Sequence, residues 1–267
     1  MQSHAIGSQA HNEVSHRASR LRSRRFLFGL LVALVFVAGF ASLARTVAYF
    51  PIDLQITRAL QSIEMAPVQQ LFHAVSWVGF PPQSNYIFGT VILALLLVGL
   101  RLEAVMTAFA AVGSASLWFL LAPLIDRPRP SPELVRVAME LPTGGFPSGH
   151  ALNLTAIFGF LIYLALVLLA DVRWRVPVIA LLAIPVVFIG AARVYDGAHW
   201  ASDVVGGYLI GGIWLALTIE LYRFGGRWLE SRRRAKHGDA ADADRHGHAE
   251  YNRIHDGEIT RPGNAPA

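Results

Sequence analysis

Six long apolar runs without Asp, Glu, Lys or Arg divide this chain, and they limit the folds that it can adopt. A helix that crosses the hydrocarbon core of a bilayer needs roughly 20 mostly apolar residues, and each run meets or approaches that length. The composition agrees, because 54% of the residues are hydrophobic and only 15% are charged. We predict the all-α fold class, with six transmembrane helices over residues 26–44, 86–100, 104–125, 151–170, 176–192 and 204–219. The second helix is expected to extend backwards through "VGFPPQSN".

The basic residues lie between these runs in a pattern that indicates orientation. Arginines precede the first run in "RASRLRSRR", join later runs in "LRLE" and "DVRWR", and follow the last run in "RFGGRWLESRRRAK". With six spans, all four segments fall on one side, which the positive-inside rule assigns to the cytoplasm. We therefore predict a multi-pass protein of the cell (inner) membrane, with both termini cytoplasmic and loops 45–85, 123–150 and 193–203 outside. This topology accounts for the net charge of +5 without a nucleic-acid partner.

Three parts of the chain are predicted from these patterns. They are a basic cytoplasmic N-terminal segment (1–25), a six-helix membrane domain (26–222) and a basic, then polar, disordered cytoplasmic tail (223–267). The first run could instead be a cleaved signal peptide, but its 19 residues exceed a usual hydrophobic region, and its removal would leave five spans. Residues 46–80 suit a helical segment at the membrane interface. The sequence has no cysteine, which excludes disulfides, thiolate metal sites and a cysteine nucleophile.

The outside loops contain three polar motifs, of which "DRPRPSPE" (126–133) is the first. Its two arginines, Arg127 and Arg129, alternate with prolines that stiffen the backbone. A guanidinium group offers a planar fork of donors to an oxyanion and keeps its charge. Taken alone, the motif also fits an ordinary charged loop beside a membrane.

The second motif, "GGFPSGHALN" (144–153), precedes the fourth apolar run. Pro147 and Ser148 are expected to start a helix, whose free backbone amides form a natural anion site. Ser148 can donate a hydrogen bond to an anion, Gly149 lets the backbone come close, and His150 lies about half a turn inside the helix. An N-cap with an interfacial histidine is the alternative interpretation.

The third motif, "AARVYDGAHWASD" (191–203), leads into the last run. His199 and Asp203 are four residues apart and therefore share one face of a helix. A carboxylate at that distance can orient an imidazole that attacks an electrophile, and Arg193 can reach the same point. An ordinary His and Asp at a helix start is again possible, but one site explains all three motifs together.

The three motifs together resemble the type 2 phosphatidic acid phosphatases, which are related in active site to bacterial acid phosphatases and vanadium-dependent haloperoxidases. The family signature is Lys-x6-Arg-Pro, Pro-Ser-Gly-His and Ser-Arg-x5-His-x3-Asp, and the resemblance covers approximately residues 50–222. The matching residues are Arg129 and Pro130, then Pro147, Ser148, Gly149 and His150, then Arg193, His199 and Asp203. Two positions depart from the signature, since the lysine is replaced by Ala122 and the leading serine by Ala192.

The resemblance implies a metal-independent membrane phosphatase without a cofactor that hydrolyses a lipid phosphate or diphosphate through a phosphohistidine. Family substrates are phosphatidic acid, phosphatidylglycerol phosphate, isoprenoid diphosphates and lipid A phosphates, and the expected partners are therefore the lipid substrate and membrane lipids. The implied catalytic residues are His199 as nucleophile, Asp203 as its orienting group and His150 as acid. The implied phosphate-binding residues are Arg129, Ser148, Gly149 and Arg193.

The missing lysine leaves other functions open. Ala122 removes one cation, so Arg127 or Arg136 compensates, or turnover is lower, or the head group differs. A phosphotransferase that uses the same phosphohistidine is one alternative. A non-catalytic protein that binds or transports lipid phosphate is another, although transport predicts ionisable residues near mid-membrane, which the apolar runs lack. A haloperoxidase would need bound vanadate and fits a membrane protein poorly.

Overall fold

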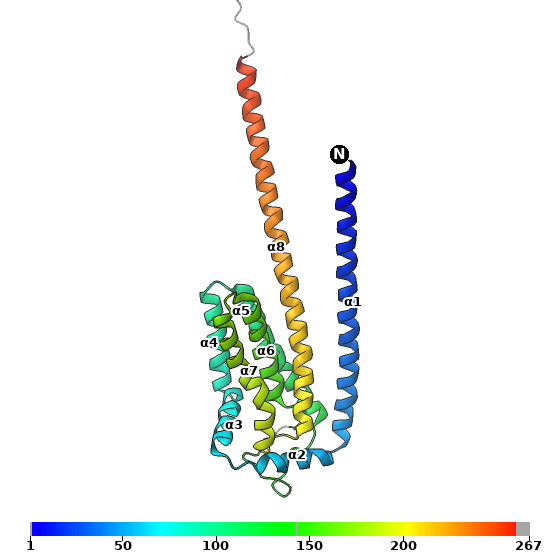
Figure 1. Cartoon of the computed structure of the whole chain (residues 1–267), viewed down its shortest axis with the longest axis vertical. Helices are drawn as coiled ribbons and strands as arrows, with labels where there is room; N and C mark the ends of the chain where they lie inside the picture. Colours follow the sequence, from blue (N-terminus) through cyan, green and yellow to red (C-terminus); the bar gives the residue numbers. More distant parts are fainter. Residues whose placement is uncertain (1, 143, 260–267) are drawn as a thin grey trace, which may run out of the picture. The chain divides into compact units, whose positions relative to one another are not determined.

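The computed structural model describes residues 2–142 and 144–259, with side chains described for 24–142, 144–232 and 234. All regular elements in this part of the chain are helices, which confirms the predicted all-α class. In chain order (Figure 1), they are α1 (Gln2–Thr46), α2 (Pro51–Gln61), α3 (Ala66–Gly79), α4 (Gln83–Leu97), α5 (Arg101–Ile125), α6 (Gly149–Leu168), α7 (Val172–Tyr195) and α8 (Ala201–Ile259).

Five helical segments of the described chain are long and apolar enough to cross a membrane by themselves. They are Arg24–Thr46, Arg101–Ile125, Gly149–Leu168, Val172–Tyr195 and Ala201–Arg232. A sixth span arises if α3 and α4, which meet at an angle of 66°, are counted as one bent pair. The predicted backward extension of the second helix is therefore wrong as a continuous helix. Pro81 and Pro82 interrupt it, because proline has no backbone N–H to donate and its ring clashes with the preceding turn.

Helix α6 lies at the centre of the bundle, where it packs against α5 and α7. Leu152 on α6 joins one buried cluster with Phe146 and Ile210. Leu154 and Phe158 join another cluster with residues of α3 and α7. Since α6 buries half of its most apolar stretch inside the protein, its N-terminal end is held from several sides.

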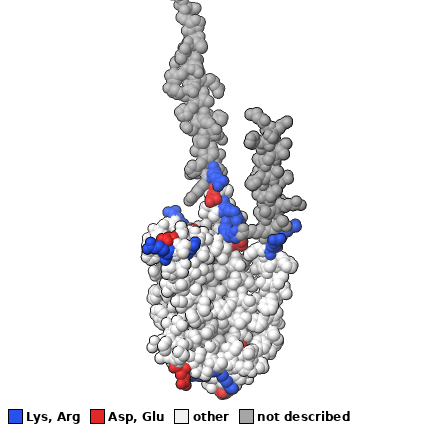
Figure 2. Space-filling view, viewed as in Figure 1, with Lys and Arg blue, Asp and Glu red and all other residues white. Residues whose placement is uncertain are grey.

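The outward faces of the helices are apolar. Large apolar side chains such as Leu97, Phe119 and Val187 are mostly exposed, whereas several polar and charged side chains are buried in the core. Figure 2 shows one face of the bundle, on which charged side chains lie at the two ends and a broad uncharged band separates them. Exposed apolar surface of this extent is typical of an interface with lipid.

The chain divides into two compact units, Met1–Ile219 and Glu220–Ala267. All residues of the predicted site belong to the first unit. The sequence predicts a disordered tail from residue 223, but α8 continues as a helix to Ile259. No proline interrupts the chain between Ile219 and Pro262, and alanine, arginine and glutamate in this stretch favour helix.

Candidate active site

The predicted histidines and arginines meet at a cavity of about 600 Å³. The α5–α6 loop contributes Arg129, the start of α6 contributes His150, the end of α7 contributes Arg193, and the α7–α8 loop contributes His199. Beyond these polar groups the cavity runs between α4, α5 and α6, where its walls include Phe88, Ile92, Val112, Leu154 and Ile157. The cavity therefore combines a cationic end with an apolar channel.

His199 has a defined tautomer. Its side chain is only 3% exposed, its Nδ1 lies 2.7 Å from the carbonyl oxygen of Gly145, and its Nε2 lies 3.1 Å from Nη1 of Arg129. A carbonyl only accepts and a guanidinium only donates, so Nδ1 bears the proton and Nε2 presents its lone pair. Burial is the largest cause that lowers the pKa of His199 well below 6.5, and Arg129, Arg193 and His150 lower it further, while the bond to Gly145 opposes them. The ring is therefore neutral at neutral pH.

Asp203 lies behind His199 but is bound mainly to other groups. Its Oδ2 is 3.9 Å from Nδ1 of His199 and accepts a 2.9 Å hydrogen bond from the amide of Trp200. Its Oδ1 accepts a 2.6 Å hydrogen bond from Arg127. The sequence predicts that Asp203 orients His199, whereas in the structure the carbonyl of Gly145 makes the direct hydrogen bond. A backbone carbonyl has no sequence signature, so the sequence could not indicate it.

Arg127 occupies a buried network beneath the cavity. It is fully buried and donates to Asp203, to Asp53 of α2 at 3.2 Å, to Ser202 at 2.7 Å and to the carbonyl of Val47 at 3.0 Å. Asp53 is not among the site residues that the sequence predicts, although its place as a charged residue among apolar ones in the 46–80 segment is a signal for it. The network joins α2 to the start of α8 and fixes the carboxylate of Asp203.

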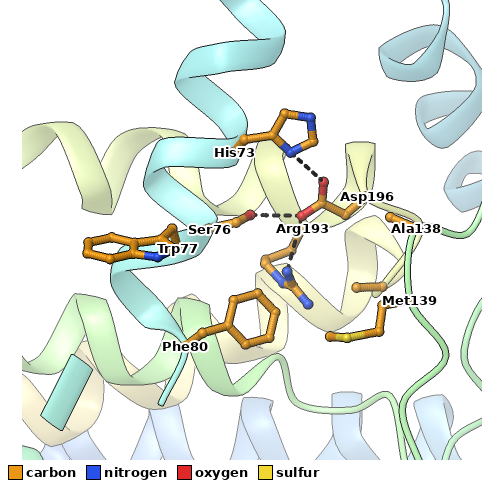
Figure 3. Close-up of a pocket in the computed structure, with 9 residues that line it drawn as sticks. His73, Ser76, Trp77, Phe80, Ala138, Met139, Arg193 and Asp196 are labelled. Carbon is orange, nitrogen blue, oxygen red and sulfur yellow. Dashed lines mark hydrogen bonds and ion pairs between the residues drawn. The ribbon is translucent and has the colours of Figure 1, made fainter. Parts of the chain in front are cut away.

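Arg193 is held from the opposite side. Its Nη1 donates to Oδ2 of Asp196 at 3.1 Å, and this oxygen also accepts a 2.8 Å hydrogen bond from Ser76. Figure 3 shows these groups around a second, smaller cavity of about 260 Å³, with His73 4.0 Å from the other carboxylate oxygen of Asp196. The guanidinium also lies 4.8 Å from the ring centre of Phe80. These contacts fix the direction of Arg193, which lines both cavities.

His150 packs tightly against the turn between α3 and α4. Its ring lies 4.5 Å from that of Phe80 in an edge-to-face arrangement, and its Nε2 is buried without a hydrogen-bond partner. A methyl group at Gly79 would overlap Cδ2 of the imidazole. The absence of a side chain at Gly79 therefore allows His150 to occupy this position.

Helix α6 begins where the sequence predicts a helix start, with Ser148 as its N-cap residue, but the side chain of Ser148 makes no capping hydrogen bond. Its Oγ is buried without a partner, and its amide donates to the carbonyl of Asp203 at 3.0 Å. Gly149 lines the main cavity beside it. Ser148 and Asp203 thus lie next to the cavity, whereas the other five predicted site residues line it.

The family's lysine position is occupied by Ala122, and neither Arg127 nor Arg136 brings a positive charge into the cavity in its place. Ala122 is buried near the end of α5. Arg127 is bound in the network with Asp53, and Arg136 donates to the carbonyl of Gln61 at 3.2 Å. Neither arginine lines the cavity. The structure therefore does not favour the alternative in which Arg127 or Arg136 compensates for the lysine, because each binds other groups.

Among the described residues, no group of three or more His, Asp or Glu side chains is arranged to hold a metal ion. The titratable groups that line the main cavity are two histidines and two arginines. Such a set offers donors and positive charge to an oxyanion with several oxygens.

The fold and these residues define an integral membrane protein of helical type with a cationic cavity at one end of its bundle. The sequence profile of the PAP2 superfamily matches residues 93–227, half of the chain, and the chain therefore belongs to this superfamily. The resemblance inferred from the three motifs is confirmed.

Two solved structures are similar to this one. The first is a transmembrane PAP2-type phosphatidylglycerolphosphate phosphatase from Bacillus subtilis, with 19% identity, a TM-score of 0.62, and coverage of 72% of this chain and 94% of that one. The second is LpxE from Aquifex aeolicus, with 21% identity, a TM-score of 0.51, and coverage of 64% and 96%. At these identities the likeness establishes the fold. No curated protein sequence matches the chain.

Proposed function

We propose that this protein is a phosphatase that hydrolyses a lipid phosphate or diphosphate through a phosphohistidine at the outer face of the cell membrane. The observation that carries the proposal is the position of Nε2 of His199. This nitrogen is unprotonated, lies 3.1 Å from the guanidinium of Arg129, and belongs to a side chain that lines the same cavity as His150. The apolar channel that continues from this point suits the chain of a lipid.

In the first step of the proposed reaction, Nε2 of His199 attacks phosphorus and the ester P–O bond breaks. His150 gives a proton to the leaving alcohol oxygen. Arg129 and Arg193, with the hydroxyl of Ser148 and the amide of Gly149, stabilise the charge on the phosphoryl oxygens. The products of this step are the lipid alcohol and a phosphohistidine.

In the second step, His150 takes a proton from water, whose oxygen attacks phosphorus as the P–N bond breaks. This step releases inorganic phosphate and restores neutral His199. The carboxylate of Asp203, 3.9 Å from Nδ1, stabilises the positive charge that the ring gains during the cycle. Because guanidinium groups supply the positive charge at the phosphoryl site, the proposed reaction needs no metal ion.

The test of this function is phosphate release by the detergent-purified protein with EDTA present. Phosphatidic acid, phosphatidylglycerol phosphate and undecaprenyl diphosphate are offered separately, each with and without a short-chain alcohol as acceptor. Free phosphate from at least one lipid supports the proposal. Transfer to the alcohol without free phosphate would indicate the phosphotransferase instead, and lipid binding without either product would indicate a binding or transport protein.

Replacing Gly79 by alanine is expected to lower kcat by about 10²-fold, since an added methyl group overlaps the ring of His150 and must displace it. The measurement is steady-state hydrolysis of the best lipid substrate. Gly212→Ala on α8 is the matched control, because no heavy atom lies within 4 Å of the added methyl group. Equal activities of the two variants would show that the position of His150 is unimportant.

The positive charge of Arg129 is expected to depress the pKa of His199, in addition to the larger effect of burial. Protonation therefore removes the nucleophile only at a pH well below 6.5. In Arg129→Gln one cation is lost, so the pKa of His199 should rise towards its ordinary value. NMR titration of ¹³C-labelled histidines, with the His199 signal assigned by its loss in His199→Gln, measures this change. An unchanged or lower midpoint in Arg129→Gln would contradict the prediction.

The proposed orientation follows from the directions of the helices. Helices α5 and α7 begin at Arg101 and beside Arg173, and both end at the loops that form the cavity. Arg101 and Arg173 thus lie at the ends of these helices opposite to the cavity, and by the positive-inside rule we propose that the cavity faces outside. Because the sequence has no cysteine, Glu133→Cys and Ser231→Cys provide single labels. A membrane-impermeant maleimide should label Glu133→Cys in intact cells, and Ser231→Cys only after lysis; the reverse pattern would overturn the orientation.

A further inference from the structure

Two of the polar groups that line the cavity and that the proposed reaction does not use are buried without a hydrogen-bond partner. They are Nε1 of Trp118 on α5 and Oδ1 of Asn153 on α6. Both atoms are buried without a hydrogen-bond partner, and both residues line the main cavity. A buried polar group without a partner is unfavourable, so a ligand that supplies both hydrogen bonds would gain binding energy from them.

Both residues lie next to the phosphoryl site. Asn153 is three residues after His150 and therefore shares its face of α6. A methyl group at Gly149 would lie 2.8 Å from Nε1 of Trp118, so the indole packs directly against the first turn of α6. These positions correspond to the part of a substrate that follows the phosphoester oxygen, before its apolar chain.

The two groups define the chemistry of that part of the substrate. An indole N–H only donates a hydrogen bond, and a side-chain amide oxygen only accepts one. A hydroxyl group can do both, since it has one proton and two lone pairs. An isoprenoid phosphate has only hydrocarbon at this place and would leave both protein atoms unpaired.

We infer that Trp118 and Asn153 form a head-group subsite, an inference that rests on the proposed function. This subsite selects lipid phosphates of the glycerol type, which have a hydroxyl group near the phosphoester, over isoprenoid phosphates. The indole N–H of Trp118 donates a hydrogen bond to the hydroxyl oxygen, and Oδ1 of Asn153 accepts a hydrogen bond from the hydroxyl group. The charged groups at the cavity end bind the phosphoryl group in either class, so selection between the classes comes from these two neutral side chains.

A matched pair of substrates tests this subsite. One is a monoacylglycerol phosphate with a free hydroxyl on the central carbon, and the other is its deoxy analogue with the same acyl chain; farnesyl phosphate represents the isoprenoid class. The wild-type kcat/KM is expected to be at least about tenfold higher for the hydroxylated lipid than for the other two. Trp118→Phe and Asn153→Leu should bring this ratio towards one by loss of activity on the hydroxylated lipid alone. Asn85→Leu is the control, because Asn85 lines the same cavity but is exposed.

Three results would overturn the subsite. They are equal wild-type activity on the matched pair, equal loss of activity on both members of the pair in the variants, and a change of ratio in Asn85→Leu as large as that in Asn153→Leu. If no lipid phosphate is hydrolysed, the proposed function fails, and the subsite is tested separately by the shift of Tm that each lipid produces in the wild-type protein. Equal shifts for the matched pair would then overturn it, and a larger shift for the hydroxylated lipid that Asn153→Leu abolishes would support it.

Discussion

Replacement of His199 by glutamine is expected to lower phosphate release by at least about 10³-fold, because the proposed reaction loses the nitrogen that forms the phosphohistidine. Glutamine preserves much of the side-chain volume, and its amide can still approach the carbonyl of Gly145. The loss should therefore affect chemistry more than folding. Release of phosphate from the best lipid substrate measures the effect, and an unchanged Tm shows that the variant is folded.

The intermediate provides a direct readout of the same prediction. Wild-type protein mixed with a ³²P-labelled lipid phosphate and quenched in alkali should retain label that acid then removes, as expected of a phosphohistidine. His199→Gln should retain none. The control is His73→Gln, since the side chain of His73 is 66% exposed and its ring lies 4.0 Å from Asp196. Label that persists in His199→Gln, or is lost in His73→Gln, would refute His199 as the nucleophile.

Replacement of Arg127 by methionine is expected to destabilise the protein by about 3–5 kcal/mol, since it leaves two buried carboxylates without their shared cation. Methionine has a similar length, so the loss comes from charge and hydrogen bonds rather than from a large cavity. For a domain of this size, the effect corresponds to a decrease in Tm of roughly 10 °C. Thermal unfolding in detergent, followed by circular dichroism, measures it.

The partly exposed pair of Arg223 and Glu220 offers a matched control for Arg127. Their atoms are 3.2 Å apart, but the side chains are 30% and 34% exposed. Arg223→Met should therefore change stability by less than about 1 kcal/mol. Adding Asp53→Asn to Arg127→Met should recover part of the lost stability, because one uncompensated charge is removed. Similar Tm values for Arg127→Met and Arg223→Met would show that burial does not strengthen the interaction.

The sequence predicts the helices well where an apolar run is uninterrupted. The run over 151–170 becomes α6 (Gly149–Leu168), and the run over 176–192 lies within α7 (Val172–Tyr195). The predicted backward extension of the second helix fails at Pro81 and Pro82, because the hydropathy of a segment is the same whether its helix continues or bends. The angle of 66° between α3 and α4 depends on backbone geometry that hydropathy does not describe.

The candidate site could be predicted as a set of residues but not as a set of contacts. The spacing of His199 and Asp203 correctly places them near each other, yet the partner of Nδ1 is the carbonyl of Gly145, 54 residues upstream. The pairing of Arg127 with Asp53 across 74 residues is similarly absent from any local pattern. Both contacts arise from packing of distant segments, for which one sequence offers no periodic signal.

The buried link between Asp53 and the start of α8 has a consequence for the biosynthesis of the protein. Asp53 accepts hydrogen bonds from the amide and the hydroxyl of Ser202, 149 residues later in the chain. Helices inserted into the membrane in chain order leave this carboxylate without that partner until the last span emerges. His199 and Asp203 arrive with the same segment. Arg127, inserted earlier, holds only one of its two carboxylates until then, so the nascent chain acquires its final stability and its nucleophile in one late event.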